Sequence, residues 1–358
     1  MKAVILAGGF ATRLRPLSCT RPKILFPIVN KPLLQWTFER LARNNIKEVV
    51  MAVFHQTETH IKQAKIPKSG LQLTYSHDPI NKPLGTAGSI KKAEKRIGND
   101  SPFLVLNGDI FADVNYSEIL KQHKENGCLA TIALHEVSDP SRYGAAELSK
   151  DGKITGFVEK PPRGKAPSNL INAGVYVLNP KIFKHIPDGR AVSIEREVFP
   201  KLAEENELGG YVFTGLWRDI GKPKDYLELN RLMVRGSDNK LASKFNNVNV
   251  KKPVAFGKKV SVGKESVIGP YTILGAEVTI GKNVHISNSV ILNAVVVSDF
   301  ARIDGAIIGE GVTIGKHCQI NKGCIIGDHA KIKDKITLAV DTHVCPADEI
   351  SESSYQSD

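Results

Sequence analysis

Residues 1–27 read MKAVILAGGFATRLRPLSCTRPKILFP and place an apolar run, a glycine turn and a basic loop in immediate succession. The apolar run, Lys2–Ala7, suits a buried parallel strand. The glycines Gly8 and Gly9 follow it and allow backbone N–H groups to approach phosphate oxygens closely. Four cations occupy the next segment: Arg13, Arg15, Arg21 and Lys23. The stretch therefore predicts a strand-end loop that binds a polyphosphate.

Two common phosphate-binding motifs are absent from this stretch. It contains no GxxxxGK[ST], so the loop is not a P-loop, and no GxGxxG, so the dinucleotide-binding fingerprint is missing. A glycine turn followed by cations is a different arrangement for holding a nucleotide.

The first two-thirds of the chain alternate between strand-like and helix-like patterns. The expected strands are Lys2–Ala7, Glu48–Phe54, Leu71–Tyr75 and Phe103–Leu106, and the expected helices are Leu33–Arg43, Glu58–Lys65, Thr86–Lys95, Ser193–Glu204 and Lys224–Arg235. This alternation predicts an α/β domain over residues 1–236 with a Rossmann-like, mostly parallel sheet. Such sheets bind ligands at the carboxyl ends of their strands, where Gly8 and Asn107-Gly108-Asp109 stand.

A six-residue repeat begins after residue 249. Its apolar positions are Val250, Phe256, Val262, Ile268, Leu274, Ile280, Ile286 and Leu292, and then Ile308, Ile314, Ile320, Ile326 and Ile332. This periodicity is typical of a left-handed parallel β-helix, which we expect over residues 249–340 with four to five coils. The slip between the two runs predicts a loop inserted near Ser298–Gly305. Residues 341–358 are expected to form a polar tail.

The composition is that of an ordinary globular protein, with 41% hydrophobic and 24% charged residues. The opening apolar run is too short for a signal peptide, and no apolar run reaches membrane-spanning length. The five cysteines show no CxxC pattern, which favours neither zinc nor a disulfide framework. We therefore expect a cytoplasmic protein without membrane attachment.

The net charge of +12 is unevenly distributed along the chain. Residues from Leu241 onward hold 13 Lys and Arg against 12 Asp and Glu, which leaves 36 against 25, or +11, in residues 1–240. A basic domain that handles nucleotide and sugar phosphates fits this distribution. Nucleic-acid binding is not expected, because only 6% of residues are aromatic and no stacking motif is present.

The motif GGFATRLRPL, with RPK at residues 21–23, resembles the signature of sugar-1-phosphate nucleotidyltransferases. Further blocks of that family follow in order: LGTAG (84–88), NGD (107–109), RYG (142–144), EKP (159–161), NAG (172–174), SIEREVFP (193–200) and WRDIGKPKDY (217–226). Within the family the chain is most similar to mannose-1-phosphate guanylyltransferases. The resemblance implies attack by a sugar-1-phosphate oxygen on the α-phosphorus of an NTP, GTP being favoured, with pyrophosphate leaving.

The resemblance also implies roles for individual residues. Arg13 and Lys23 would be catalytic, with Arg13 reaching the triphosphate and Lys23 bridging both reacting phosphates. Asp109 and Asp219 would share Mg²⁺, whose preferred ligands are oxygens. The nucleotide would contact Leu6, Ala7, Gly8, Gly9, Thr12, Arg13, Lys23, Gly85, Thr86, Asn107 and Gly108. The sugar phosphate would contact Gly144, Glu159, Lys160, Asn172 and Gly174.

Three other functions stay open at this point. A UTP- or dTTP-dependent glucose-1-phosphate nucleotidyltransferase would use the same chemistry. A non-catalytic subunit that senses nucleotide sugars is a second alternative. Ala11, which stands where the family has glycine, speaks weakly for it, whereas the retention of Arg13, Lys23, Asp109, Lys160 and Asp219 speaks against it. An acyltransferase in the β-helix, with His285 or His317 as the base, is a third. The β-helix is also expected to mediate homo-oligomerisation.

Overall fold

The computed structural model describes residues 1–9, 12–236, 245 and 247–353. The chain forms two compact units. One consists of Met1–Gly9 and Leu33–Arg218, and the other of Phe10–Pro32 and Asp219–Asp358. The basic loop of the N-terminal stretch thus belongs to the same unit as the β-helix, an arrangement that the prediction of one domain over residues 1–236 did not contain.

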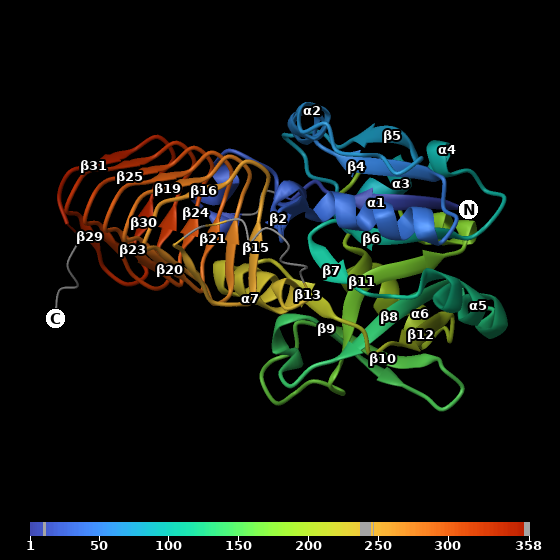
Figure 1. The fold of residues 1–358 in the computed structure, drawn as a ribbon. Coiled ribbons are helices and arrows are strands. Elements are labelled where there is room, and N and C mark those ends of the chain that lie inside the picture. Colours follow the sequence, from blue (N-terminus) through green and yellow to red (C-terminus); the bar gives the residue numbers. More distant parts are fainter. Residues whose placement is uncertain (10–11, 237–244, 246, 354–358) are drawn as a thin grey trace. The chain divides into compact units, whose positions relative to one another are not determined.

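Four parallel strands form one half of the main sheet (Figure 1). They are β1 (Lys2–Leu6), β4 (Glu48–Val53), β5 (Gln72–His77) and β6 (Phe103–Asn107). They lie in the order β6-β1-β4-β5 with parallel pairing throughout. The four strands predicted from the apolar runs are confirmed, with ends that differ by one or two residues.

The other half of the sheet is largely antiparallel. Its strands are β8 (Ala130–Glu136), β9 (Gly144–Leu148), β10 (Ile154–Glu159), β11 (Leu170–Leu178) and β12 (Leu208–Val212). Strand β11 runs antiparallel to β6, β8 and β9, and only β12 pairs in parallel, with β8. The expectation of a mostly parallel sheet is therefore corrected to a mixed sheet. A buried apolar run such as that of β11 does not reveal the direction in which its strand runs.

The helices of this unit flank the main sheet (Figure 1). Their bounds are α1 (Leu33–Arg43), α2 (His55–Gln63), α3 (Gly85–Lys92), α4 (Glu94–Ile97), α5 (Tyr116–Asn126) and α6 (Phe199–Glu204). A π-helical turn, η6 (Ile194–Val198), precedes α6, and two short strands, β7 (Ile110–Ala112) and β13 (Trp217–Asp219), lie outside the main sheet. Helix α1 has the predicted bounds.

The buried histidine of α5 makes the stability of this unit depend on pH. His123 is 3% exposed, and its Nδ1 lies 2.9 Å from Thr131 Oγ1. Burial lowers the pKa of His123 to about 4, whereas an unfolded histidine titrates near 6.5. Between these values the unfolded chain binds more protons, so stability present at higher pH is lost as the pH falls.

We therefore expect the free energy of unfolding to be about 2 kcal/mol lower at pH 5 than at pH 7 because of this one residue. Urea unfolding followed by Trp fluorescence measures it, since both tryptophans, Trp36 and Trp217, belong to this unit. His123→Gln removes the titrating group and should remove that difference. The same pH dependence in His123→Gln would contradict the assignment.

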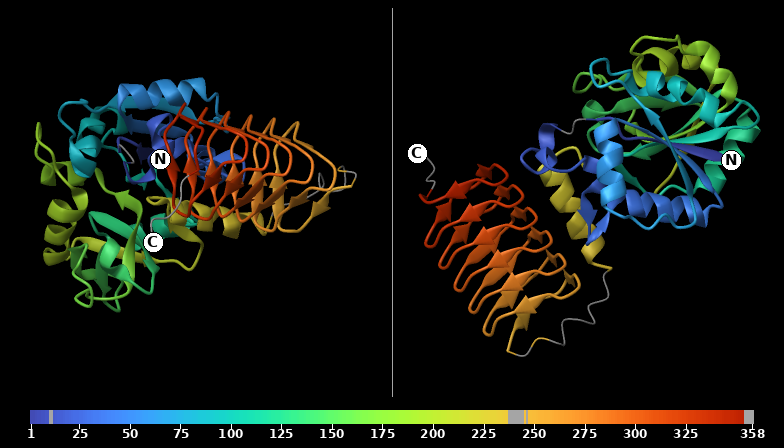
Figure 2. Two further views of the ribbon diagram at one scale, coloured as in Figure 1. Left: turned by 90° about the vertical axis from the view of Figure 1, so that its left-hand side faces the viewer. Right: turned by 90° about the horizontal axis from the view of Figure 1, so that it is seen from above.

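The second unit contains the described part of the basic loop, helix α7 (Pro223–Val234) and three parallel sheets of short strands. Two short strands, β2 (Pro27–Ile28) and β3 (Lys31–Pro32), pair within the loop segment. The successive coils of the β-helix are visible in the side views of Figure 2.

Each sheet of the β-helix has six strands. The first contains β14 (Asn249–Val250), β17 (Val267–Ile268), β20 (His285–Ser287), β23 (Arg302–Asp304), β26 (Gln319–Ile320) and β29 (Thr337–Leu338). The second contains β15 (Val254–Phe256), β18 (Thr272–Leu274), β21 (Val290–Ile291), β24 (Ile307–Ile308), β27 (Ile325–Ile326) and β30 (His343–Val344). The third contains β16 (Ser261–Val262), β19 (Thr279–Ile280), β22 (Val296–Val297), β25 (Thr313–Ile314), β28 (Lys331–Ile332) and β31 (Glu349–Ile350). A parallel β-helix of hexapeptide repeats is thereby confirmed.

Three details of the predicted β-helix are corrected. It has six coils rather than four to five. It continues to β31, so the predicted end at residue 340 and the polar tail from residue 341 are wrong; Val344 and Ile350 continue the repeat. The slip of the period is not an inserted loop near Ser298–Gly305.

The slip comes from two hexads that each lack one residue. Leu274 pairs with Ile291, 17 residues later (291 − 274), and Ile291 pairs with Ile308, again 17 residues later (308 − 291). The core position is therefore Ile291 rather than the predicted Leu292. At the shortened corner, Ser287 Oγ donates to Asp304 Oδ1 at 2.6 Å.

Two observations concern the molecule's environment. In the described part of the chain, no helix is both long enough and apolar enough to cross a membrane. All five cysteines are free thiols: Cys19 and Cys345 are exposed, whereas Cys128, Cys318 and Cys324 are buried.

Candidate active site

The glycine turn and the NGD motif meet at the carboxyl edge of the main sheet. Strands β1 and β6 are neighbours in which Leu6 pairs with Asn107, and Gly108 N donates to Leu6 O at 2.8 Å. Ala7 and Gly8 follow the end of β1, and Asp109 follows the end of β6. The sequence prediction that these two motifs share one edge is thus confirmed for this unit.

A buried aspartate that the sequence analysis missed lies beside the glycine turn. Asp78 follows β5 directly, is 6% exposed, and its Oδ2 lies 3.6 Å from the position that a Cβ on Gly8 would take. Ser89 of α3 donates to Oδ2, whereas Oδ1 has no hydrogen-bond partner among the described residues. Burial raises the pKa of Asp78. The rule that singled out Asp109, a polar residue just after a parallel strand, also applies to Asp78.

The LGTAG motif forms the first turn of α3, as predicted, but two of its N–H groups are already bonded. Ala87 N and Gly88 N donate to Val192 O at 3.0 and 3.3 Å. Gly85 has φ +70°, and a Cβ there would lie 2.5 Å from Val192 O, so glycine is required at this position. The helix start is therefore closed by protein, and these two N–H groups do not point at an anion.

A polar network connects this motif with the centre of the sheet. Thr86 Oγ1 and Ser193 Oγ each donate to Glu195 Oε2 at 2.7 Å. Tyr176 Oη lies 3.5 Å from Glu195 Oε1 and accepts from Asn172 Nδ2 at 3.0 Å. Glu195 was not among the predicted site residues, although it lies inside the SIEREVFP block.

The residues predicted to bind the sugar phosphate surround this network. Asn172 Oδ1 accepts from Gly174 N at 2.8 Å. Gly174 has φ +71°, and a Cβ there would lie 3.0 Å from Asn107 Nδ2, so the predicted sugar and nucleotide residues come together here. Burial, and then the nearby carboxylate of Glu195, raise the pKa of Glu159.

Two more of the predicted residues lie at the start of β9 and the end of β10. A Cβ on Gly144 would lie 2.8 Å from Glu159 Oε2. Lys160 is exposed, has φ +52°, and its Nζ lies 3.7 Å from Glu159 Oε1. The positive charge of Lys160 is thus held next to the carboxylate of Glu159.

The second unit brings together the predicted catalytic cations and one predicted metal ligand. Lys23 is 8% exposed, and its Nζ lies 3.1 Å from Asp219 Oδ1. The position that a Cβ on Gly221 would take lies 3.0 Å from both carboxylate oxygens of Asp219 and 3.3 Å from Arg13 Nη2. Arg13 and Asp219 therefore both lie close to Gly221. Thr12 begins the 3₁₀ turn that contains Arg13.

The other residues of the basic loop are not all placed in this group. Arg21 pairs with Asp328 and Glu310 instead, at 2.7 and 2.9 Å. Arg15 is exposed. The predicted effect of Ala11 concerns a residue outside those that the structure describes. Asp109 belongs to the first unit and Asp219 to the second.

The first unit also contains a cluster of possible metal ligands that sequence spacing did not indicate. The ligand atoms of His55, Glu58 and His77 lie within 4.8 Å of one another. Glu58 already forms a hydrogen bond with His77 Nε2 and an ion pair with Lys62 at 2.6 Å. The rings of His55 and His77 are stacked with centroids 3.8 Å apart, so their planes are parallel and do not converge on a common point. The cluster is held together by its own contacts.

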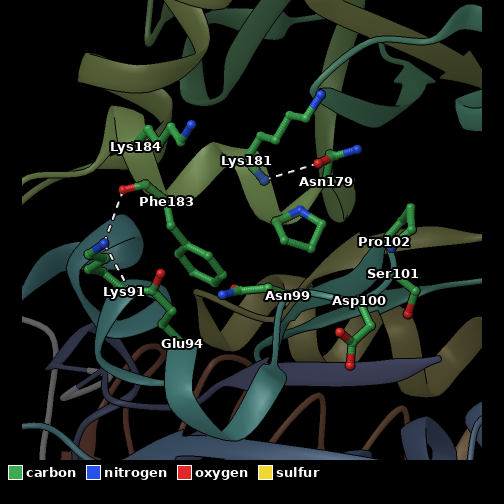
Figure 3. A pocket seen from close by; sticks show the side chains of 11 residues that line it. Lys91, Glu94, Asn99, Asp100, Ser101, Pro102, Asn179, Lys181, Phe183 and Lys184 are labelled. Carbon is green, nitrogen blue, oxygen red and sulfur yellow. Dashed lines mark hydrogen bonds and ion pairs between the residues drawn. The ribbon is translucent and has the colours of Figure 1, made fainter.

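A cavity of about 490 Å³ lies at the opposite edge of the sheet (Figure 3). Its lining includes Ser101 and Pro102, just before β6, and Asn179 and Lys181, just after the antiparallel β11. None of the predicted site residues lines it. The candidate site is therefore the carboxyl edge, where the family motifs are found.

The chain belongs to the nucleotidyl transferase family, whose model matches residues 2–235. Residues 250–358 match the model described as the GMPPB C-terminal domain.

Similar proteins are found in animals, fungi and plants. The chain is 40% identical over 229 residues to the mannose-1-phosphate guanylyltransferase catalytic subunit beta of Drosophila pseudoobscura pseudoobscura, with 63% of this chain and 60% of that protein covered. It is 43% identical over 232 residues to the mannose-1-phosphate guanyltransferase of Yarrowia lipolytica, with 63% and 62% covered. The match thus spans a little over half the length of these relatives.

A solved structure shares the fold of about two-thirds of the chain. HddC from Yersinia pseudotuberculosis superposes with a TM-score of 0.55 at 29% identity, with 65% of this chain and 99% of that chain covered.

Proposed function

We propose that this chain transfers a guanylyl group from GTP to mannose-1-phosphate, giving GDP-mannose and pyrophosphate. The observation that carries the proposal is the convergence of Lys23, Arg13 and Asp219 around Gly221. Two cations and a carboxylate in one partly buried group are suited to a reaction between two phosphates. The names of the relatives, one of them a catalytic subunit, favour this activity over a regulatory role.

The reaction needs in-line positioning and neutralisation of charge more than covalent help from the protein. A phosphate oxygen of mannose-1-phosphate attacks the α-phosphorus of GTP, the new P–O bond forms, and the bond to the β-phosphate breaks. We assign Lys23 to both reacting phosphates and Arg13 to the triphosphate. Guanidinium and ammonium groups at these positions can stabilise negative charge that develops on the α-phosphate.

We propose Asp109 and Asp219 as ligands of a divalent cation, with Mg²⁺ as the ion. Members of the nucleotidyl transferase family generally use a divalent metal. Carboxylate oxygens are the protein ligands that Mg²⁺ prefers, alongside phosphates and water. When bound, the ion would supply charge neutralisation at the α-phosphate. Lys23, which pairs with Asp219 here, would hold that carboxylate in orientation.

We propose that Asp78 recognises the guanine base of GTP. Its Oδ1 is buried without a partner among the described residues, next to the glycine turn. Guanine offers two adjacent donors, N1–H and the 2-amino group, to a carboxylate, whereas uracil and thymine offer one N–H and adenine offers no N1–H. An acceptor that is buried and unpaired gains most from such donors. This pairing favours GTP over UTP and dTTP.

Asp78→Asn is expected to lower kcat/KM for GTP by about 10- to 100-fold, the worth of one or two charge-assisted hydrogen bonds. The value for UTP should change by less than about threefold. Steady-state kinetics with both nucleotides measures the two effects, and Asn preserves the size of the side chain. An equal loss for GTP and UTP would show that Asp78 supports the fold and does not read the base.

The polar network around Asn172 and Glu159 supplies the contacts that we assign to mannose-1-phosphate. Asn172 offers both donor and acceptor atoms, and Glu159 can accept from sugar hydroxyls. Lys160 carries a positive charge for the phosphate. The glycines Gly144 and Gly174 let neighbouring side chains of this group, Glu159 and Asn107, approach the backbone closely.

Pyrophosphate release tests the proposal, measured for GTP, UTP, dTTP, ATP and CTP against mannose-1-phosphate and glucose-1-phosphate with Mg²⁺. The combination of GTP and mannose-1-phosphate should dominate by at least tenfold in kcat/KM. A dominant UTP or dTTP combination would keep the chemistry and overturn the specificity. No release for any pair, by a folded protein that binds GDP-mannose, would favour the regulatory alternative.

We also propose that the protein acts in the cytoplasm and that its β-helix mediates homo-oligomerisation. The second proposal rests on exposed apolar side chains along the coils, such as Val296 and Phe300. Light scattering at micromolar concentration should give a mass above that of one chain, and a monomer would contradict it.

A further inference from the structure

Residues Thr20 and Arg21, which lie between Arg13 and Lys23 in the sequence, are hydrogen-bonded to side chains at one corner of the β-helix. Thr20 Oγ1 donates to Asp328 Oδ2 at 2.6 Å, and Arg21 Nη2 donates to the same oxygen at 2.7 Å. Arg21 Nη2 also donates to Glu310 Oε2 at 2.9 Å. The Asp328 side chain is 4% exposed and that of Arg21 17% exposed, so this ion pair is shielded from water and from screening by salt.

Only one carboxylate oxygen of Asp328 forms a hydrogen bond within the repeat itself. Its Oδ1 accepts from Glu310 N at 2.7 Å, which joins one coil to the next. The same corner bond recurs from Lys282 N to Asp299 and from Lys316 N to Asp334, at 2.8 and 2.7 Å. Oδ2 of Asp328 is therefore an addition to the repeat, and its partners come from the basic loop.

This contact withdraws Arg21 from the set of cations available to phosphate. Burial alone would lower the pKa of Arg21, but Asp328 and Glu310 outweigh it and raise the pKa. The guanidinium thus stays charged and is satisfied by two carboxylates. The role of Arg21 is therefore structural, whereas Lys23, two residues later, forms an ion pair with Asp219.

The same segment is held again beyond Lys23. Tyr226 Oη donates to Pro27 O at 2.7 Å, and Val29 N donates to Asn230 Oδ1 at 2.9 Å. Asn30 Nδ2 donates to Leu274 O at 2.9 Å, at the end of β18. Strand β18 belongs to the same sheet of the β-helix as β24 and β27, the strands that Glu310 and Asp328 follow. Lys23 therefore lies between two attachment points, both of which involve the β-helix.

We propose that the β-helix is a positioning element of the active site, in which Asp328 and Glu310 hold Thr20 and Arg21 so that Lys23 stays at Asp219. Asp328, Glu310 and Arg21 are positioning residues, because they act through Lys23 and touch no substrate. This inference rests on the proposed function for its kinetic consequence, but the attachment itself can be tested without turnover.

The decisive variant is Asp328→Asn in the full-length chain. Asparagine keeps an Oδ1 acceptor for Glu310 N, and so preserves the corner bond, while removing the charge that faces Arg21. We expect kcat for pyrophosphate release to fall by about 10- to 100-fold, the range for a lost charge-assisted hydrogen bond, with KM for mannose-1-phosphate changed by less than about threefold. Amide hydrogen exchange over residues 17–25 should become about tenfold faster or more.

The matched control is Asp334→Asn, because Asp334 makes the same corner bond and forms no hydrogen bond or ion pair with the loop residues that the structure describes. It should leave both kcat and the exchange of residues 17–25 within about twofold of the wild type. Arg21→Gln removes the charge from the other partner and leaves the corner bond of Asp328 with Glu310 N intact, so it should change kcat and the exchange of residues 17–25 to about the same extent as Asp328→Asn. Thr20→Val, which keeps the ion pair, should have a smaller effect than Asp328→Asn.

Asp328→Asn behaving like Asp334→Asn in both readouts would overturn the inference. If the wild type releases no pyrophosphate with any substrate, the proposed function fails, and hydrogen exchange alone then decides on the attachment. Faster exchange in Asp328→Asn and unchanged exchange in Asp334→Asn would still support it.

Discussion

Replacing Lys23 by alanine is expected to lower kcat by about 10²- to 10³-fold, the cost of one lost group that stabilises charge in the transition state. The side chain is 8% exposed and held 3.1 Å from Asp219, so no solvent cation can take over its fixed position. Because Lys23 acts on the transition state in this account, KM for GTP should change much less than kcat. Steady-state kinetics of pyrophosphate release measures both.

Lys259→Ala is the control for this variant. Lys259 belongs to the same unit and pairs with Glu277 at 2.8 Å, but both side chains are mostly exposed, so the pair contributes little. Its removal should leave kcat unchanged. An intact kcat in Lys23→Ala, with a folded protein by circular dichroism, would remove Lys23 from the catalytic role.

Asp219→Asn is expected to lower kcat by about 10³-fold at saturating Mg²⁺, since a metal that stabilises transition-state charge contributes several kcal/mol. Asparagine retains the shape of the side chain but loses the negative charge facing Lys23 and the metal. Asp109→Asn should have an effect of the same size. Mn²⁺ binding in the presence of GTP, followed by electron paramagnetic resonance, should weaken by at least about tenfold in each variant.

The control for the metal ligands is Asp299→Asn. Asp299 accepts from Lys282 N at a corner of the β-helix, and asparagine can accept that bond equally well. Metal binding and turnover should both match the wild type. If Asp219→Asn lowered turnover yet bound Mn²⁺ normally, Asp219 would serve to orient Lys23 and would not be a metal ligand.

The parts of the fold that local sequence determines were predictable. Strand β1 is an uninterrupted apolar run ended by glycines, and α1 has helical periodicity from Leu33 to Arg43, so both were found at nearly their observed ends. The direction of β11 was not predictable, because its buried residues LINAGVYVL look the same in parallel and antiparallel pairing. The antiparallel pairs of β11 with β6, β8 and β9, together with the antiparallel pair of β9 and β10, make the sheet mixed.

The apolar positions of the β-helix repeat were predicted correctly up to Ile286, where the first of two hexads is one residue short. The shortened hexads after Ile286 and Ile303 shift the apolar position by one, and Leu292, next to the true core residue Ile291, fitted the pattern as well. Only the pairing of Leu274 with Ile291 reveals the register.

Within the candidate site, the sequence revealed the motifs, but it did not reveal which side chains contact each other. Lys23 and Arg13 stand in a recognisable loop, but nothing in the letters indicates that Arg21 pairs with Asp328, 307 residues later. Asp78 could have been found, since it follows a strand at the carboxyl edge as Asp109 does. Glu195 lay inside a recognised block, but its bond to Thr86 depends on a contact 109 residues apart in sequence.

The measurement that most directly tests guanylyl transfer is product identification by ³¹P nuclear magnetic resonance after incubation with Mg²⁺, GTP and mannose-1-phosphate labelled with ¹⁸O on its phosphate. We predict GDP-mannose and pyrophosphate in equal amounts, with label in the bridge between the two phosphates, because the sugar phosphate supplies the attacking oxygen. GDP and inorganic phosphate as the products, or GTP recovered unchanged alongside unreacted mannose-1-phosphate, would contradict the account.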